Sequence, residues 1–264
     1  MKFKIDHDLH IHTVLSLCAD GDERQNKFAL LKYAEDNGLK TICVTDHYWD
    51  SAVEGASDWY KPQNFEHISK IKPLPESNGV KFLFGCETEL NRQCVLGIPK
   101  ERFDDFDFII IPTTHMHMGG GFVVRGDESP KERAELWKSR LNAVLDMDLP
   151  FGKVGIAHLT CTLIDKGPKG YLEVLRNISD EDFEKCFKKA AEKGVGIELN
   201  FNSLTIDDDE FNEVLRPYKI AKEQGCKFYL GSDAHHPEGF ERAVENFSKI
   251  VDALGLEETD KFRI

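Results

Sequence analysis

The chain has 264 residues, of which 41% are hydrophobic and 31% charged, a balance typical of folded globular proteins. Lysine and arginine total 34 against 47 aspartates and glutamates, so the formal net charge is −13. Phosphate backbones are bound mainly by clustered lysine and arginine, which argues against duplex nucleic acid as a partner but leaves a short oligonucleotide open. Divalent metals among the carboxylates would reverse the local potential, so small anionic ligands stay compatible with this charge.

Targeting and disulfide signals are absent from the sequence. The amino-terminal residues contain no apolar secretory core, and no run approaches the roughly 18 apolar residues that cross a bilayer. The seven cysteines are odd in number, scattered and without a CxxC pair, which argues against a disulfide framework or a zinc ribbon. We expect a cytoplasmic protein with no membrane segment, folded as one domain over residues 1–264.

Short apolar runs alternate with helix-like segments along the chain. The expected strands are 2–7, 39–46, 80–87, 106–112, 154–157, 195–200 and 226–233. The expected helices lie near 23–37, 130–146, 180–193, 207–224 and 238–254. In four places a glycine closes a polar segment just before an apolar run, as αβ connections require. The alternation predicts an α/β fold with a parallel sheet covered by helices.

Polar residues at the strand ends favour a closed barrel over an open sheet. From Asp6 to His12 the even-numbered positions are polar, whereas the odd-numbered positions from Phe3 to Ile11 are mostly apolar. One face of this strand should therefore pack on helices while the other faces a polar interior. Seven strands arranged in this way predict a seven-stranded (β/α) barrel similar to a TIM barrel.

Histidines concentrate where the expected strands end. Nine of the ten histidines lie at or just beyond a strand end: His7, His10, His12, His47, His115, His117, His158, His235 and His236. Acidic residues accompany them, namely Asp46, Glu87, Glu89 and Asp233. Because the carboxyl ends of parallel strands meet at one edge, these side chains should converge there. Imidazole with carboxylate suits zinc, manganese or iron, and several such ligands suit catalysis.

Five motifs make this pattern specific. They occur in the order DLHIHT at 8–13, TDH at 45–47, GCE at 85–87, AH at 157–158 and GSDAH at 231–235. The ordered set resembles the PHP (polymerase and histidinol phosphatase) family over nearly the whole chain. The resemblance implies a distorted seven-stranded (β/α) barrel that holds two or three divalent ions, typically zinc, manganese or iron, and hydrolyses phosphoesters.

The resemblance also implies a ligand set. It assigns the first metal to His10, His12, Glu87 and Asp233. It assigns the second metal to Glu87, His115 and His158, and the third to His47 and His235. Two positions stay open, because His117 could replace His115, and because Cys18 takes the place of a further histidine of the third site. Either the Cys18 thiolate or the nearby Asp20 could bind there.

The implied activity is hydrolysis of a small phosphomonoester, such as histidinol phosphate or a nucleotide, by a metal-bridged hydroxide that attacks phosphorus in line. Asp233 and His235 are the candidate catalytic residues that protonate the leaving group. Arg125 and Arg242 are candidates for binding the substrate. Two alternatives are an amidohydrolase-type C–N hydrolase, which would have eight strands and a bridging lysine, and a non-catalytic metal-binding barrel.

Overall fold

The structure is a computed structural model that describes residues 1–200 and 210–264. Its strands are β1 (His7–Ile11), β2 (Thr41–Val44), β3 (His47–Tyr48), β4 (Lys81–Thr88), β5 (Phe108–Pro112), β6 (Val154–Ala157), β7 (Gly196–Leu199) and β8 (Lys227–Leu230). They form one parallel sheet in the order β1-β2-β4-β5-β6-β7-β8, and the short β3 pairs with β4 off this path.

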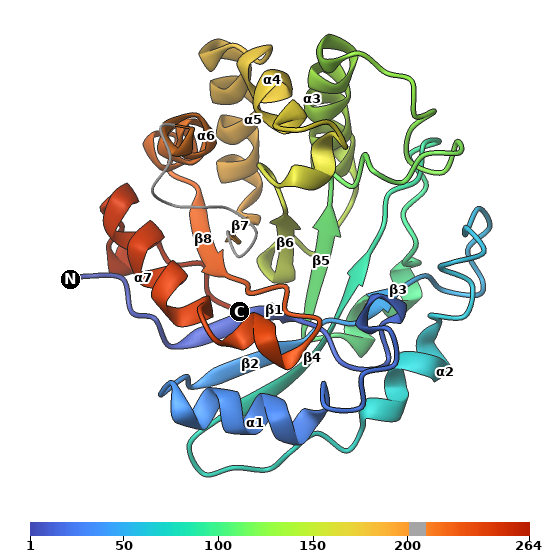
Figure 1. Ribbon diagram of the computed structural model, residues 1–264, viewed down its shortest axis with the longest axis vertical. Coiled ribbons are helices and arrows are strands. Elements are labelled where there is room, and N and C mark those ends of the chain that lie inside the picture. Colours follow the sequence, from blue (N-terminus) through green and yellow to red (C-terminus); the bar gives the residue numbers. More distant parts are fainter. Residues whose placement is uncertain (201–209) are drawn as a thin grey trace.

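The sheet closes almost completely between β1 and the residues that follow β8. The Asp233 N–H donates to the His10 carbonyl at 2.7 Å, and the His12 N–H donates to the Ala234 carbonyl at 3.1 Å. Figure 1 shows the strands at the centre of the molecule with helices around them. The expected seven-stranded (β/α) barrel is thereby confirmed, with β3 as a two-residue addition.

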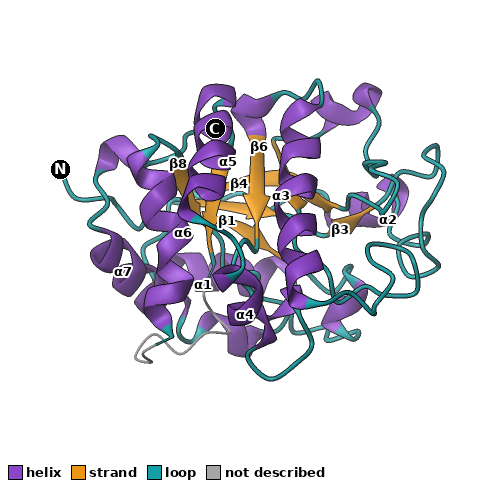
Figure 2. Cartoon of the chain, turned by 90° about the horizontal axis from the view of Figure 1, so that it is seen from above, coloured by secondary structure: helices purple, strands orange, loops and turns teal. Residues whose placement is uncertain are grey.

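Seven α-helices in the described ranges cover the barrel: α1 (Lys27–Asp36), α2 (Phe65–Ile68), α3 (Pro130–Asp146), α4 (Gly170–Arg176), α5 (Asp180–Lys193), α6 (Phe211–Glu223) and α7 (Ala243–Leu254). Seen from above, α3, α5 and α6 stand around the strands (Figure 2). None of the described helices is long and apolar enough to cross a membrane.

Local signals explain the helix boundaries that the sequence predicts well. α3 begins after a capping box in which the Ser129 and Glu132 side chains satisfy each other's backbone N–H groups. α5 ends at Gly194, whose left-handed φ of 72° suits glycine. Both helices agree residue for residue with the expected ranges. The expected start of α6, at 207–209, lies outside the described residues.

The first strand differs from the sequence expectation. We expected it at 2–7, but β1 begins at the end of that range, and its register to β2 shifts between Asp8 and Ile11. Leu9 packs inside the barrel, while the Asp8 carboxylate accepts a hydrogen bond from Tyr33 of α1 at 3.2 Å. The predicted alternation of polar and apolar faces therefore does not hold along β1, because the bulge changes the direction of the side chains that follow it.

Apolar side chains fill the amino end of the barrel. We call this set the amino-end plug; its members are Leu9, Cys43, Leu83, Phe108, Ile110, Ala157, Tyr229 and Phe262. Gly155 lies against it so closely that a Cβ atom would meet Phe108 and Tyr229 at 2.6 Å. The barrel is thus a packed core and not a pore, as in other small parallel barrels.

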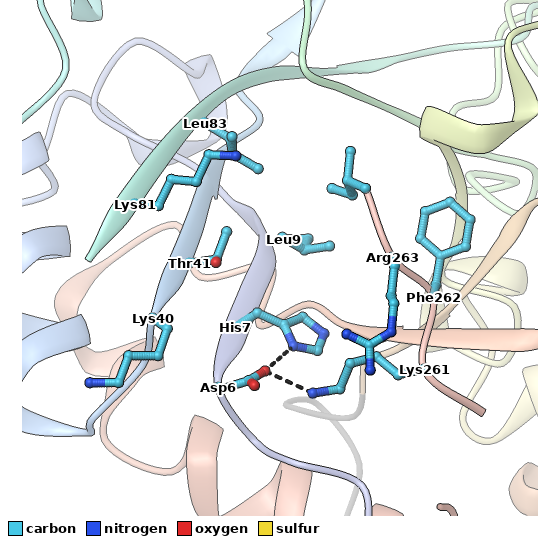
Figure 3. Close-up of a pocket in the computed structure, with 11 residues that line it drawn as sticks. Asp6, His7, Leu9, Lys40, Thr41, Lys81, Leu83, Lys261, Phe262 and Arg263 are labelled. Carbon is cyan, nitrogen blue, oxygen red and sulfur yellow. Dashed lines mark hydrogen bonds and ion pairs between the residues drawn. The ribbon is translucent and has the colours of Figure 1, made fainter. Parts of the chain in front are cut away.

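A cavity of about 200 Å³ lies at the amino end, beside the plug (Figure 3). At its edge Asp6 binds Lys261 Nζ at 2.8 Å and His7 Nδ1 at 2.9 Å. His7 Nε2 accepts the Leu230 N–H at 3.1 Å, so the His7 proton lies on Nδ1. The expectation that His7 joins the other histidines is wrong, because this residue opens β1 and therefore sits at the opposite end of the barrel.

Candidate metal centre

The structure brings all nine predicted ligand residues together at the carboxyl end of the barrel. They occur in groups of side chains whose ligand atoms lie within 4.8 Å of one another. The groups are His10–His12–Glu87–Asp233, Glu87–His115–His158, His10–His158–Glu198 and His12–Cys18–His47–His235. Residues far apart in sequence meet here because every strand of a parallel barrel delivers its carboxyl end to the same mouth.

Glu87, at the end of β4, is at the centre of the cluster and fully buried. Its Oε2 lies 2.8 Å from His47 Nδ1 and 3.4 Å from His12 Nε2. Its Oε1 lies 3.1 Å from His158 Nε2 and 3.8 Å from His115 Nε2. The two oxygens thus face different sets of imidazoles, which is the arrangement that a bridging carboxylate requires.

Asp233 follows β8 and closes the cluster from the other side. Its Oδ1 lies 3.1 Å from His12 Nε2 and 3.4 Å from His10 Nε2, and its Oδ2 lies 3.6 Å from His158 Nδ1. Asp233 and His158 both have left-handed backbones, with φ of 53° and 60°. Such conformations are uncommon outside glycine and are concentrated at functional sites, where they aim a side chain that a regular turn would misdirect.

Several ligand atoms are buried and have no hydrogen-bond partner. They include His47 Nδ1, Glu87 Oε2 and Asp233 Oδ1. The first two lie 2.8 Å apart, but not in the geometry of a hydrogen bond. Leaving a buried polar atom unpaired costs about 1–3 kcal/mol, so three in one place point to a ligand that pairs with them. The residues present therefore fit divalent metal ions.

The charge of the site also fits a cation. Burial opposes the charge on His10, but the carboxylates of Glu198, Asp233 and Glu87 outweigh burial and hold the pKa of His10 well above its ordinary value. Burial likewise opposes ionisation of Glu87, yet the surrounding imidazoles keep the pKa of this carboxyl well below its usual range. The carboxylates therefore attract either protons or metal ions into the same small volume.

Two other imidazoles are already in the form that binds metals. Burial lowers the pKa of His115 to about 4 and that of His235 to about 3. Both are therefore neutral near pH 7, and a neutral imidazole is the state that coordinates zinc or iron.

Glu198, at the end of β7, is a functional residue that the sequence motifs do not indicate. Its Oε1 lies 2.5 Å from His10 Nδ1, and its Oε2 accepts the His158 N–H at 3.0 Å. Gly231 makes room for it, because a Cβ atom there would lie 2.3 Å from the carboxylate. Glu198 therefore orients His10 so that Nε2 faces the cluster, as carboxylates do behind histidine ligands.

Glu89 has the same role on the opposite side. Its Oε2 binds His115 Nδ1 at 2.8 Å, and its Oε1 accepts a hydrogen bond from Arg140 of α3 at 3.0 Å. Arg140 also donates to the carbonyls of Thr113 and Leu90. Glu89 is thus a supporting carboxylate paired with a buried arginine, and it holds His115 Nε2 toward Glu87.

A third support holds His12. The Ser16 hydroxyl donates to Asp46 Oδ1 at 2.7 Å and lies 2.9 Å from His12 Nδ1. Asp46 also accepts the N–H and the hydroxyl of Thr13, each at 2.7 Å. The buried Asp46 carboxylate therefore fixes the loop after β1 and, through Ser16, the orientation of the His12 ring.

Comparison with known proteins agrees with this geometry. The profile of the PHP domain matches residues 8–202, more than half of the chain. The chain belongs to the PHP domain family. It is 28% identical over 265 residues to a probable phosphatase of Vibrio campbellii, covering 97% of this chain and 87% of the relative. A probable phosphatase of Acetivibrio thermocellus is 24% identical over 241 residues and covers 89% of this chain and 80% of the relative.

The fold is also that of a solved structure. Histidinol phosphate phosphatase from Lactococcus lactis, complexed with zinc, L-histidinol and phosphate, superposes with a TM-score of 0.63 at 18% identity. The match covers 98% of this chain and 99% of that chain.

The cluster of predicted ligand residues lies at the floor of a cavity of about 490 Å³. Trp59, Met118, Phe122 and Leu163 provide apolar walls, and the described lining contains no lysine or arginine. His115 joins a ligand group, whereas His117 only lines the cavity and its Nδ1 has no hydrogen-bond partner. The geometry thus favours His115 over His117 as the ligand.

The two arginines that the sequence suggests for substrate binding lie outside the described lining of this cavity. Arg125 is exposed and forms ion pairs with Asp127, Glu128 and Glu132. Arg242 is exposed at the start of α7. His236, also expected at the mouth, lies 3.4 Å from Asp22 and belongs to none of the ligand groups.

Proposed function

We propose that this protein is a metal-dependent phosphatase that hydrolyses small phosphomonoesters. The observation that carries the proposal is the set of buried, unpartnered ligand atoms at the floor of an open cavity. Histidine and carboxylate ligands beside a cavity suit a catalytic zinc, manganese or iron site and not a closed structural one. PHP membership, the relatives described as probable phosphatases and the zinc, histidinol and phosphate in the Lactococcus structure support the same reading.

Two metal positions follow from the groups of imidazoles and carboxylates. The first would be held by His10, His12, Glu87 and Asp233. The second would be held by Glu87, His115 and His158. Glu87 belongs to both groups, and its two oxygens face the two sets of imidazoles, so it is the residue that would bridge the ions.

When bound, divalent ions neutralise phosphate oxygens and lower the pKa of a water molecule toward neutrality, which provides a nucleophile. The residues of the chain supply the rest. Because the described lining has no lysine or arginine, the side chains do not pair with the phosphate charge, and the cluster must receive the phosphoryl group itself. Trp59 and Phe122 then contact the remainder of the substrate above it.

Asp233 or His235 is proposed to pass a proton from a water molecule to the leaving alkoxide, because neither residue carries an acidic proton of its own near pH 7. Asp233 Oδ1 lies 3.7 Å from His235 Nε2, and both residues line the cavity. A carboxylate has two oxygens, so Asp233 can bind a metal through one of them and exchange a proton through the other. The His235 ring stacks on His12 with centroids 4.1 Å apart, which fixes its position at the mouth.

The substrate is proposed to be small, with histidinol phosphate and mononucleotides as the leading candidates. A cavity of about 490 Å³ is within the range of sites for small molecules, and the net charge of −13 disfavours a long polyanion. The amidohydrolase alternative is less well supported. The sheet path contains seven strands, and the carboxylate of Glu87 occupies the bridging place where a lysine would be expected.

The decisive experiment is to purify the protein, count its metals by elemental analysis and assay phosphate release. Histidinol phosphate, mononucleotides, short oligonucleotides, an amide and a lactone should be tested side by side. We expect hydrolysis of a small phosphomonoester that a chelator abolishes and added zinc, manganese or iron restores. Full activity in metal-free protein, or hydrolysis of the amide or lactone alone, would overturn the proposal. Bound metal without turnover of any phosphoester would identify a non-catalytic metal-binding barrel.

A further inference from the structure

One of the four ligand groups in the described part of the chain differs chemically from the others. It consists of His12, Cys18, His47 and His235, and it contains a thiol and no carboxylate. Each of the other three groups contains at least one carboxylate. Cys18, His47 and His235 also line the 490 Å³ cavity, so this group lies open to the substrate side of the cluster.

Cys18 is held in this group by a rigid frame. It lies in the 3-10 turn Leu17–Ala19, which follows directly after Ser16. The Ser16 hydroxyl donates to Asp46 and accepts the N–H of His47 at 3.1 Å. The Leu17 N–H donates to the Gln63 side chain at 3.0 Å, which fixes the turn from its other side. The backbone that carries the thiol is therefore tied to the same buried carboxylate that orients His12.

A second observation indicates a ligand at this group. His47 Nδ1 is buried and has no hydrogen-bond partner, since its 2.8 Å approach to Glu87 Oε2 lacks hydrogen-bond geometry, and packing against Trp59, with ring centroids 5.0 Å apart, holds the His47 ring in place. The nearby Asp20 belongs to none of the ligand groups and is exposed, with its backbone turned to a left-handed φ of 49°. Of the two residues that could complete the group, the geometry selects Cys18.

We propose that Cys18, His47 and His235 bind a soft divalent ion, of the class of zinc, iron(II) or cobalt(II), that manganese does not replace. Thiolate and imidazole donors select these ions, whereas carboxylate-containing sets also accept manganese. On binding, the Cys18 thiol releases its proton to solvent and the sulfur donates to the metal. The inference rests on the proposed metal centre and adds that one position in it discriminates between metals, so that the protein holds three zinc or cobalt ions but two manganese ions.

The test is a titration of the metal-free, full-length protein with cobalt(II), followed by absorption spectroscopy. A cobalt–thiolate bond gives a near-ultraviolet charge-transfer band that imidazole and carboxylate ligands do not give. Wild-type protein should bind three equivalents, and the band should accompany one of them. A parallel titration with manganese(II) should stop at two. In a separate alkylation assay, bound zinc should protect Cys18 from iodoacetamide and bound manganese should not.

Four variants make the result specific. Cys18→Ser should lose one cobalt equivalent and the band, while Cys18→His should recover the third equivalent without the band. Cys94→Ser, at an exposed cysteine, should match the wild type. Cys161→Ser tests the buried thiol beside Thr114 and should keep the band.

Three results would each overturn the inference: a band that survives Cys18→Ser, a band lost in Cys161→Ser, or a third manganese equivalent. In all three cases at least two ions would still bind and phosphate would still be released, so the proposed phosphatase would stand. If no cobalt binds at all, the proposed metal centre is wrong, and the proposed ion site at Cys18, His47 and His235 is wrong with it.

Discussion

The two ends of the barrel differ in the side chains that fill their interior, which are apolar at the amino end and polar at the carboxyl end. At the amino end the interior is filled by the amino-end plug, and the polar groups beside it pair with one another, as Asp6 does with His7 and Lys261. At the carboxyl end the interior contains histidines and carboxylates, and three of the predicted ligand atoms there are buried without a hydrogen-bond partner. Strands a few residues long thus pass from an apolar core, in which the Tyr229 hydroxyl is one buried atom without a partner, to a polar cluster in which several ligand atoms have none.

This difference suggests that the amino end mainly stabilises the fold and that the carboxyl end mainly binds ligands. Buried apolar area stabilises the fold wherever it lies, whereas buried unpaired polar atoms cost free energy until a ligand pairs with them. The barrel can tolerate the cost at one end because the other end is tightly packed. Substitutions at the two ends should therefore have separable effects, and four predictions test this separation in order of decreasing size.

The largest effect is expected from Glu87→Ala at the carboxyl end. Glu87 contacts both sets of imidazoles, so its loss should release both ions of the proposed pair together. We expect phosphatase kcat/KM to fall on the order of 10⁴-fold, equivalent to about 5.4 kcal/mol of transition-state stabilisation. Elemental analysis should show the matching loss of metal.

Glu101→Ala is the matched control, because Glu101 is an exposed glutamate outside the cluster, in the 3-10 segment before β5. It should keep both metal content and activity. If Glu87→Ala retained two metal equivalents, Glu87 would not be the bridging residue.

The next prediction concerns the amino-end plug. Phe108→Ala removes a buried ring that packs edge to face on Tyr229, with centroids 5.1 Å apart. Large-to-small changes of this kind cost about 3–5 kcal/mol of unfolding free energy. We expect that loss in denaturant titrations, with kcat and metal content per folded molecule close to wild type. Loss of bound metal in the folded variant would show that the two ends are coupled after all.

The contrast between the ends is also where sequence prediction succeeds and fails. The number of strands along the sheet path and the boundaries of α3 and α5 follow from local signals, namely glycine after helices and capping before them. Seven of the nine predicted ligand positions lie in motifs at strand ends, whereas Cys18 and His115 lie outside the motifs. The bulge in β1 does not follow from the local sequence. It accompanies closure of the barrel onto the residues after β8, where the Asp233 N–H donates to the His10 carbonyl. His7 is misplaced for a different reason: the strand is expected to end at His7, whereas β1 begins there.

Glu198 shows a different limit. It lies in the run GIEL of β7, where a single glutamate among buried apolar residues is a visible signal of an interior polar contact. Nothing in the local sequence says which residue it contacts, because its partner His10 is 188 positions away. Glu89 is similar: its spacing from Glu87 is visible, but its pairing with Arg140 depends on how α3 packs against β4.

The third prediction compares these two supporting carboxylates. Glu198→Gln and Glu89→Gln keep the side-chain volume but replace the carboxyl group behind a ligand imidazole. Burial raises the pKa of Glu89 to about 8, so its replacement removes less charge near pH 7. Changes of this kind typically cost 10–100-fold in metal affinity, by order of magnitude. Glu198 has no cation like Arg140 beside it in the described hydrogen bonds, so we expect Glu198→Gln to weaken metal binding more than Glu89→Gln.

Competition with a chelator would measure both affinities, and Glu192→Gln, an exposed position near the end of α5, is the control. Each variant should also show a larger change in metal affinity than in unfolding free energy of the metal-free protein. Equal effects on both quantities would indicate a structural role for these carboxylates and not a positioning one.

The smallest effect is expected from Arg125→Ala. Arg125 is half exposed, pairs with three carboxylates and lies outside the described lining of the cavity. Exposed ion pairs of this kind contribute little, so KM for the best phosphomonoester should change less than about threefold. Arg242→Ala should behave alike. If either change raised KM tenfold or more at constant metal content, an arginine would reach the phosphate in the bound state. The positive charge at the carboxyl end would then come partly from side chains, whereas small effects would leave metal ions as its source.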